Sequence, residues 1–319
     1  MTSRIQHQGS VPKESSQDRL DLVVAALFPQ YSRSRLQTWI KSGELLVDGR
    51  LWNAKDKVSG GELVKIDAIA STIVDEAEDI PLEIMFEDES VLVLNKPSGL
   101  VVHPGAGNRK GTLLNALLHY CPELNEVPRA GIVHRLDKET TGLMVIARTI
   151  ESQASLVQQL QSREVKRLYE AVVYGLTPKQ GVVDAPIGRH RLQRTRMAIR
   201  ESGKEAITRY KLIRAYKSHS YVELSLETGR THQIRVHMQH LGYPLIGDPA
   251  YGGQFRIPRK GGEQLGSVLK AFPRQALHAK ELSFKHPATQ AQVTFKKVSP
   301  EDFGLLIEAL EKDLSIENG

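Results

Sequence analysis

Strand-like segments, short and rich in branched apolar residues, recur after residue 90 and constrain the fold of this chain more than any other feature. They occur at residues 90–105, 142–148, 166–175, 205–216 and 219–229. Helical periodicity appears in fewer segments, chiefly residues 151–163, 231–242 and 300–314. Because many of the strand candidates are joined by short turns, the pattern predicts an α+β fold on a largely antiparallel, mixed sheet.

The amino-terminal part of the chain has a different pattern from the strand-rich part after residue 90. Residues 18–75 combine two amphipathic helix candidates with two short strand candidates, which predicts a small αβ unit. Residues 1–17 are polar and contain no apolar run, so we expect a disordered tail. Residues 76–89 carry seven acidic residues and no basic one, and we interpret them as an acidic linker. A catalytic domain is then expected over residues 90–319.

The composition limits the compartment in which this protein works. Cys121 is the single cysteine, which excludes an internal disulfide and a thiolate zinc cluster. The first residues do not resemble a signal peptide, and no apolar run approaches the roughly 18 residues that a membrane-spanning helix needs. We therefore expect a cytoplasmic protein without a membrane partner.

Positive charge is concentrated in one segment. Residues 186–217 carry ten Lys or Arg against two Glu, whereas the whole chain has a net charge of only +6. A solvated hairpin is the ordinary fate of such a run, but so many neighbouring cations repel one another unless a polyanion neutralises them. The phosphate backbone of a nucleic acid is the favoured partner.

Two segments place polar residues inside otherwise apolar elements. GIVHRLDKETTGL sets Asp137 in a loop, and TGRTHQIRVH sets Arg230 just before a helix candidate. A cation at the amino end of a helix makes a positive corner, and a carboxylate brought to that corner is stabilised as the anion. We therefore expect Arg230 to pair with Asp137. Arg135 then has a different role, since a surface pair between Arg135 and Asp137 would contribute only about 0–1 kcal/mol.

These segments match a known family. HRLDKETTGL resembles the H-R-L-D-x-x-[ST]-[ST]-G-L motif of the RluA family of pseudouridine synthases, and KRLYEAVVYG, TGRTHQIRVH and LHAKELSFKHP resemble three further family segments. NKPSGLVVHPG and LIGDPAYG match two more, and together the matches follow family order over most of residues 84–290. Residues 18–67 resemble the S4 RNA-binding domain. This combination is most similar to the RluD group of the family, which implies a pseudouridine synthase fold preceded by an S4-like domain.

The resemblance implies a role for each matched residue. Asp137 corresponds to the family's catalytic aspartate, which acts as a nucleophile or stabilises a ribosyl intermediate; whether it attacks base C6 or ribose C1′ stays open. Arg230 is implied to pair with Asp137, and Tyr169 to stack on the uracil. Arg135 is implied to fill the space that an everted uridine leaves. Leu282 is most simply a core residue, and the alternative is that it lines the uracil pocket.

The implied reaction and substrate follow from the same family. Uridine is isomerised to pseudouridine without a cofactor or a metal, in 23S ribosomal RNA or the pre-ribosomal large subunit, at a stem-loop comparable to helix 69. Arg33, Arg35 and Lys41 are implied to form the RNA face of the S4-like unit. The family also implies a monomer. The sequence does not decide which uridines are modified.

Three alternatives remain at this stage. One is a pseudouridine synthase acting on tRNA, and another is a non-catalytic RNA-binding module in which Asp137 is dispensable. The third is a metal-dependent hydrolase, which the eleven histidines suggest, although the spacing of His232 and His237 does not place two rings on one helical face. His134 is more simply a structural hydrogen-bonding residue. We interpret residues 252–275 as a mobile basic loop, because the segment is rich in glycine and has no regular periodicity.

Overall fold

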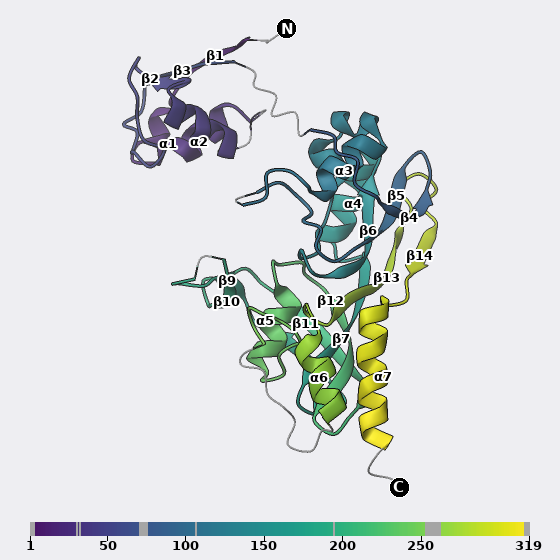
Figure 1. Ribbon diagram of the computed structural model, residues 1–319. Coiled ribbons are helices and arrows are strands. Elements are labelled where there is room, and N and C mark those ends of the chain that lie inside the picture. Colours follow the sequence, from purple (N-terminus) through teal and green to yellow (C-terminus); the bar gives the residue numbers. More distant parts are fainter. Residues whose placement is uncertain are drawn as a thin grey trace. The chain divides into compact units, whose positions relative to one another are not determined.

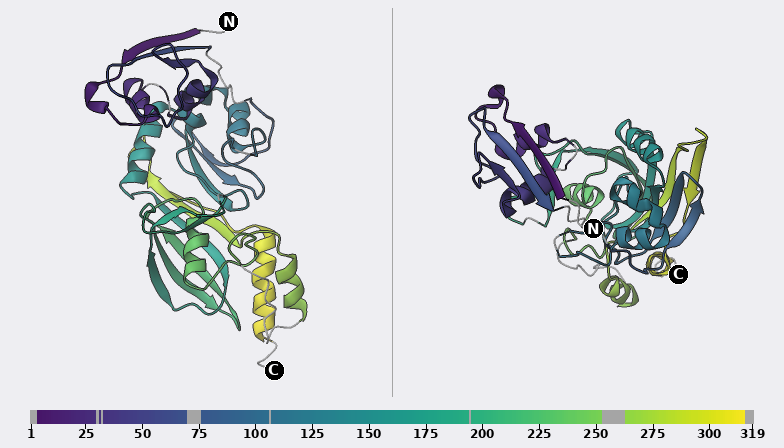
Figure 2. Two further views of the ribbon diagram at one scale, coloured as in Figure 1. Left: turned by 90° about the vertical axis from the view of Figure 1, so that its left-hand side faces the viewer. Right: turned by 90° about the horizontal axis from the view of Figure 1, so that it is seen from above.

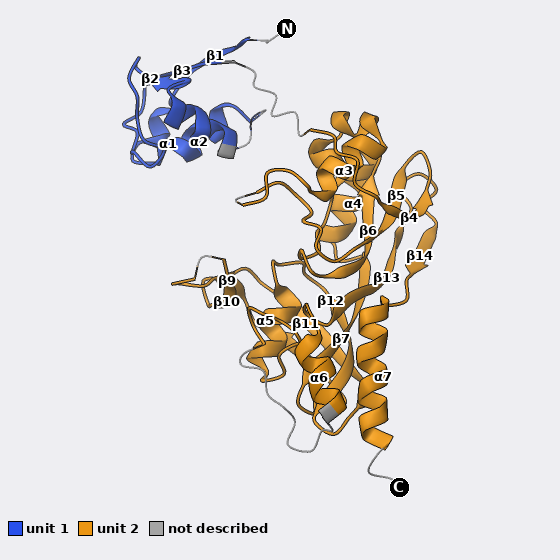
Figure 3. Cartoon of the chain, viewed as in Figure 1, with its two compact units in different colours: residues 1–74 blue, residues 75–319 orange. Residues whose placement is uncertain are grey.

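The computed structural model describes residues 4–29, 31, 33–69, 76–105, 107–193, 195–252 and 263–315. The chain forms two compact units, Met1–Val74 and Asp75–Gly319, which are coloured separately in Figure 3. Each unit has its own hydrophobic core. No helix among the described residues is long and apolar enough to cross a membrane.

The first unit packs two helices on a small antiparallel sheet. Its elements are β1 (Arg4–Ser10), η1 (Lys13–Ser15), α1 (Leu20–Leu27), α2 (Arg33–Ser42), β2 (Leu45–Val47) and β3 (Leu63–Ile69), with the strands in the order β1, β3, β2. Leu20, Val23 and Val24 form one stripe of α1 and are buried in the core of the unit. The expected tail is wrong for residues 4–17, because β1 pairs with β3 along its whole length, while residues 1–3 lie outside the described part of the chain. Its polar sequence is that of an edge strand whose side chains remain mostly exposed.

The second unit is built on one mixed sheet (Figure 1). Its strands are β4 (Glu83–Glu87), β5 (Val91–Lys96), β6 (Thr141–Ala147), β7 (Lys166–Tyr174), β8 (Gln180–Asp184), β11 (Ile207–Ala215), β12 (His219–Leu226), β13 (Leu277–Lys285) and β14 (Gln292–Lys296). The order is β4, β5, β6, β13, β7, β12, β11, β8, and β14 pairs with β13. Among the described strands, only β6 and β13 pair in parallel. The expected α+β fold on a largely antiparallel mixed sheet is confirmed.

The acidic segment contributes to this sheet. Residues 83–87 form β4, which pairs antiparallel with β5, so residues 76–89 are not a separate linker. The second unit begins at Asp75. Asn115 also donates from its side-chain nitrogen to the Glu76 carbonyl at 2.7 Å, which ties the start of the acidic segment to a helix. The linker was predicted from charge alone. Charge does not show whether a segment pairs as a strand, so β4 was missed.

Helices cover the sheet of the second unit. They are α3 (Leu113–Tyr120), α4 (Ile150–Gln161), α5 (Gln233–His240), α6 (Glu263–Ala271) and α7 (Glu301–Ser315), with the short turns η2 (Pro122–Glu126) and η3 (Pro128–Gly131). Alternate residues of the central strands enter different cores: Leu92 and Leu94 pack with α3, whereas Val91 and Val93 pack with α4. The last helices, α6 and α7, lie side by side (Figure 2) and share a third core.

The basic segment forms a hairpin and part of the main sheet. β9 (Ile187–Arg189) pairs antiparallel with β10 (Met197–Ile199), and β11 follows. The interpretation of residues 252–275 as a loop is wrong in part, because α6 occupies Glu263–Ala271 and Arg274 is only 2% exposed. Residues 253–262 lie outside the described part of the chain.

Candidate active site

Two glycines set the loop that carries Asp137. Gly131 has φ +72°, and a Cβ there would lie 1.8 Å from the Ala147 carbonyl oxygen. Gly142 has φ +120°, and a Cβ there would lie 2.4 Å from the Ala279 carbonyl oxygen. Only glycine permits both the conformation and the close approach. The loop therefore leaves η3 and enters β6 along one defined path.

A buried lysine holds the backbone of this loop. The Nζ atom of Lys96, at the end of β5, donates to the carbonyl oxygens of Pro97 (2.6 Å), Leu100 (3.0 Å) and Lys138 (2.9 Å). Burial lowers the pKa of Lys96 to about 7, although the charges of Glu139 and Asp137 act in the opposite direction. Three carbonyl acceptors match the three protons of the ammonium form. Lys96 thus joins two loops next to Asp137.

Lys96→Met is expected to lower the free energy of unfolding by about 3 kcal/mol, because three carbonyl groups lose their donor. Turnover should fall with it, since Lys138 directly follows Asp137. Lys138→Met is the matched control, because the Lys138 side chain is exposed and the hydrogen bond uses only its backbone. Chemical denaturation of both variants checks the expectation, and equal stabilities would contradict the role given to Lys96.

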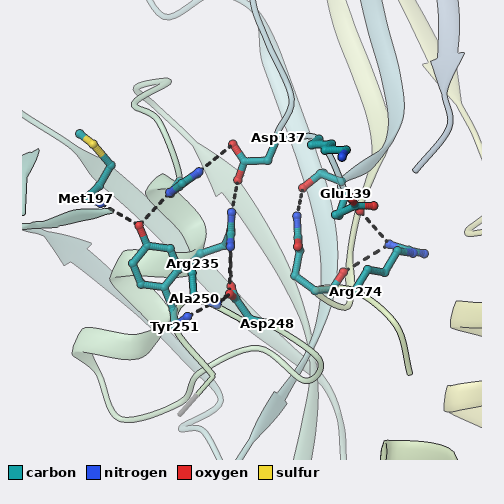
Figure 4. A network of polar contacts seen from close by, with 12 residues as sticks. Asp137, Glu139, Met197, Arg235, Asp248, Ala250, Tyr251 and Arg274 are labelled. Carbon is teal, nitrogen blue, oxygen red and sulfur yellow. Dashed lines mark hydrogen bonds and ion pairs between the residues drawn. The ribbon is translucent and has the colours of Figure 1, made fainter. Parts of the chain in front are cut away.

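The Asp137 carboxylate is paired with Arg235, an arginine in the first turn of α5. Arg235 Nη1 donates to Asp137 Oδ2 at 3.0 Å, and its Nε and Nη2 donate to Asp248 at 2.7 and 2.9 Å (Figure 4). Burial alone would lower the pKa of Arg235, but the hydrogen bonds and charges of Asp248 and Asp137 outweigh it and raise that pKa. One guanidinium therefore bridges two carboxylates. Among the described residues, none donates a hydrogen bond to Asp137 Oδ1, which stays available for chemistry.

The expectation that Arg230 pairs with Asp137 is wrong. Arg230 Nε donates to the Glu205 carbonyl oxygen at 2.9 Å. The backbone turns between the two arginines at His232, whose φ is +57°, and the two guanidinium groups reach different partners. Arg230 still lines the cavity that contains Asp137.

Gln233 explains why this turn is rigid. Its side-chain oxygen accepts from the Thr228 hydroxyl (2.8 Å) and the Arg230 amide (3.0 Å), and its nitrogen donates to the Ile207 carbonyl and the Thr208 hydroxyl, both at 3.0 Å. The sequence placed the start of this helix at residue 231, two residues before the observed start of α5. Arg230, directly before that expected start, was therefore chosen as the partner of Asp137, and Arg235 was missed. The available signal was Asp248 in the LIGDPAY segment, a buried acid that requires a cation.

Tyr169 lies with Asp137 in this cavity. Tyr169 is on β7, is 5% exposed, and lines the cavity together with Asp137, Arg235 and Leu277. Burial raises the pKa of the Tyr169 phenol, so the ring is neutral at physiological pH. A neutral ring beside a carboxylate can pack against a flat, uncharged base.

Leu282 does not line this cavity. It is 1% exposed and packs in a core that includes Val93, Leu143 and Phe284. β13 pairs with β6 only at His278 and Ala279, and its register with β7 shifts before Glu281. Leu282 itself pairs with Phe295 of β14 on one side and with Arg167 of β7 on the other. Leu277, at the other end of β13, takes the cavity position that was expected of Leu282.

Tyr251 links the basic hairpin to Asp137. Its hydroxyl accepts from the Met197 amide of β10 at 2.8 Å and lies 2.7 Å from His232 Nδ1 (Figure 4). His232 Nε2 lies 3.9 Å from Asp137 Oδ1. The guanidinium groups of Arg196 and Arg235 each lie 5.0 Å from the centroid of the Tyr251 ring. Burial lowers the pKa of His232, which favours a neutral ring that accepts the Tyr251 proton.

Tyr251→Phe is expected to reduce turnover several-fold and stability by about 1–2 kcal/mol, because His232 and the Met197 amide lose one partner. Tyr216→Phe is a matched control, since the Tyr216 hydroxyl donates to the Glu311 carboxylate at 3.0 Å, and among the described residues no hydrogen bond joins that hydroxyl to Asp137 or its partners. Comparing turnover at equal fractions of folded protein separates the two effects. A Tyr216 variant as slow as the Tyr251 variant would show that the loss comes from stability alone.

Arg135 and His134 have different environments although they are neighbours. Arg135 is exposed and lines the Asp137 cavity, and no hydrogen bond or ion pair joins it to Asp137 within the described chain. His134 Nε2 accepts from the Val145 amide at 3.1 Å, where β6 has separated from β13. Burial, followed by the charge of Arg167, lowers the pKa of His134 to about 3. His134 is therefore neutral and completes the sheet, in agreement with a structural role.

The three basic residues expected on the first unit differ in their partners. Arg33 donates to the buried carboxylate of Asp21 at 2.7 Å, so part of its role is structural. The Arg35 guanidinium lies 5.1 Å from the Trp39 ring centroid. Lys41 is exposed in the last turn of α2. An RNA contact by these residues remains a prediction.

Metal ligands do not converge in the described part of the chain. No group of three or more His, Cys, Asp or Glu side chains there is arranged to hold a metal ion. The hydrolase alternative therefore has no ligand set among these residues.

Two family models match the sequence. A model described as RNA pseudouridylate synthase matches residues 90–240, which include Asp137, Tyr169 and Arg235. A model of the S4 domain matches residues 18–64 of the first unit. The boundaries agree with the division of the structure into two units.

Curated proteins and a solved structure are similar over most of the chain. Ribosomal large subunit pseudouridine synthase D from Pseudomonas aeruginosa is 51% identical over 314 residues, covering 98% of each chain. The protein of the same name from Xanthomonas campestris is 50% identical over 307 residues, covering 96% of this chain and 93% of the other. The structure of human RNA Pseudouridylate Synthase Domain Containing 4 has a TM-score of 0.56 and 27% identity, covering 72% of this chain and 93% of that one.

Proposed function

This chain belongs to the RNA pseudouridylate synthase family, and we propose that it converts specific uridines of large-subunit ribosomal RNA to pseudouridine. The observation that carries the proposal is the Asp137 carboxylate, held by Arg235 at 3.0 Å in a cavity that Tyr169 also lines. The similar proteins named for the large ribosomal subunit supply the substrate class. The finer substrate is a stem-loop of 23S RNA, free or in a pre-ribosomal large subunit.

The reaction rearranges atoms without adding any. The bond between ribose C1′ and uracil N1 breaks, the base turns, and a bond between C1′ and C5 forms while the C5 proton leaves and N1 gains one. Asp137 Oδ1 supports this step either as a nucleophile or by stabilising positive charge on the sugar. Arg235 orients the carboxylate through Oδ2. No redox or phosphoryl change is involved, so the chain's own residues suffice in this proposal.

The neighbouring residues handle the substrate. The Tyr169 ring is proposed to pack against the uracil, and Arg135 to fill the stack that the everted uridine vacates. Arg35 and Lys41 of the first unit are proposed to contact the RNA backbone. We propose that the protein acts as a monomer, in the cytoplasm where ribosomes assemble.

Mapping pseudouridines in ribosomal and transfer RNA from cells lacking the gene tests the function. We expect loss at uridines within large-subunit RNA, and restoration by the wild-type gene. Loss confined to tRNA would transfer the proposal to that substrate, and unchanged maps of both RNAs would refute it. Purified protein should form the same pseudouridines on a large-subunit RNA transcript without an added cofactor.

A further inference from the structure

A buried arginine that has no carboxylate partner among the described residues lies beside the candidate active site. Arg167 is on β7, two residues before Tyr169, so the two side chains leave the same face of the strand roughly 7 Å apart. It is 7% exposed. Within the described chain its Nε atom has no hydrogen-bond partner, and its Nη2 reaches only the Leu226 carbonyl oxygen at 3.4 Å. A buried cation in this state normally requires an anion.

Arg167 opens on a strongly basic cavity. The cavity has a volume of about 520 Å³, and Arg129, Arg135, Arg163, Arg167 and Arg230 contribute to its lining. Its acids, Glu205 and Glu227, are already bound: Arg163 reaches them at 2.7 and 3.4 Å, and Arg209 reaches Glu227 at 2.6 Å. For Arg129, Arg135 and Arg167, the described residues offer no carboxylate within ion-pair distance. The volume suits a nucleotide rather than a small ion alone.

This cavity adjoins the one that contains Asp137. Arg135 and Arg230 line both cavities. An RNA strand whose target base lies against Tyr169 therefore has a positively charged path beside it. Arg230, which does not pair with Asp137, has a place on this path.

A glycine keeps the space around the Arg167 guanidinium open. A Cβ at Gly229 would lie 2.9 Å from Arg167 Nη1. The backbone of Gly229 is not in the left-handed region, so this position favours glycine for space and not for conformation. Alanine there would displace the guanidinium without removing its charge.

We propose that this cavity is a phosphodiester subsite, in which Arg167 binds a backbone phosphate next to the nucleotide that reacts at Asp137. A guanidinium binds phosphate oxygens through two parallel hydrogen bonds, and Arg167 has its Nε and Nη groups available for them. The subsite positions the target uridine by its own backbone, independently of the base. This inference rests on the proposed function, because it assumes an RNA strand at Asp137.

The first test is the salt dependence of RNA binding. The affinity of the purified full chain for a large-subunit RNA transcript is measured against salt concentration for wild type, Arg167→Gln and Lys166→Gln. Losing one phosphate contact should weaken binding about tenfold and reduce the slope of log affinity against log salt by about 1. Lys166 is the matched control, because it is adjacent on β7, 60% exposed and paired with Glu281. Wild-type slope and affinity in Arg167→Gln would overturn the inference.

The second test identifies the phosphate. Transcripts carrying one neutral methylphosphonate are made for each position flanking the mapped uridine. One position should weaken binding to wild type, and Arg167→Gln should be insensitive to the same substitution. If the loss of affinity from Arg167→Gln simply added to the loss from the methylphosphonate at every position, the inference would be overturned. Gly229→Ala, which retains every charge, should reproduce part of the Arg167→Gln defect, and wild-type binding by a folded Gly229→Ala protein would count against it.

The two proposals can fail separately. If wild type leaves every uridine of large-subunit RNA unchanged, the proposed function fails whatever the slopes are. If wild type and Lys166→Gln are active and Arg167→Gln binds with an unchanged slope, the phosphodiester subsite alone fails. Thermal unfolding of each variant ensures that folded proteins are compared.

Discussion

Asp137→Asn is expected to reduce pseudouridine formation on the order of 10⁴-fold or more, because an amide can neither attack carbon nor stabilise a positive sugar as a carboxylate does. RNA affinity should remain within about threefold of wild type, since phosphate contacts supply most of the binding free energy. The structure supports this separation, because Asp137 is paired internally with Arg235 and contributes no cation to the RNA. Single-turnover kinetics and binding on the same transcript give both numbers.

Glu139→Gln is the matched control for this experiment. Glu139 lies two residues along the same loop, and its carboxylate accepts from the Ser98 hydroxyl at 2.7 Å, outside the Asp137 cavity. It should retain nearly full turnover. Normal turnover in Asp137→Asn would eliminate the mechanism and favour the non-catalytic RNA-binding alternative. Equal losses of turnover and affinity would show that Asp137 acts through RNA binding.

Arg235→Met is expected to have the largest effect on stability, lowering the free energy of unfolding by about 3–5 kcal/mol. The substitution leaves two carboxylates without their cation, and the Asp248 side chain is fully buried. Turnover should fall beyond what the lost stability explains, because Asp137 loses its orienting contact. Arg235→Lys should recover only part of either property, since one ammonium group cannot reproduce the planar guanidinium that reaches both acids.

Arg230→Met tests the assignment of the pairing. Arg230 is the neighbouring arginine of the same motif, and its guanidinium reaches a backbone carbonyl instead of Asp137. The free energy of unfolding of Arg230→Met should differ from that of wild type by no more than about 0.5 kcal/mol. Any effect on turnover should come with weaker RNA binding, because Arg230 lines the basic cavity. A variant at Arg230 that is stable, binds normally and is inactive would contradict the arrangement at Asp137.

Local sequence patterns were sufficient to predict much of the architecture and the loop that carries Asp137. Alternation over β12 and the apolar runs of β6 and β7 predicted the sheet, because period-2 burial is a property of neighbouring residues. The loop of Asp137 was recognisable from its polar residues between apolar segments. The family motifs located Tyr169, and the structure places it with Asp137 in one cavity.

Other features depended on contacts between distant parts of the chain. The polar β1 is a strand because β3 supplies its hydrogen bonds, and no local pattern reveals such a partner. Leu282 packs in a different core from Leu277 although both are on β13, and the strands that line each core come from distant parts of the chain.

By itself, the sequence determined the α+β class, the two units and the carboxylate at the centre of the site, because each follows from residues that are close in the chain. Only the tertiary structure decided that Arg235 and not Arg230 binds Asp137, and that Arg167 lies beside them without a carboxylate among the described residues. Asp137 and Arg235 are 98 residues apart in sequence. Which of two nearby arginines reaches the acid depends on the turn at His232 and on the buried Asp248, and a local sequence pattern shows neither the turn nor the burial.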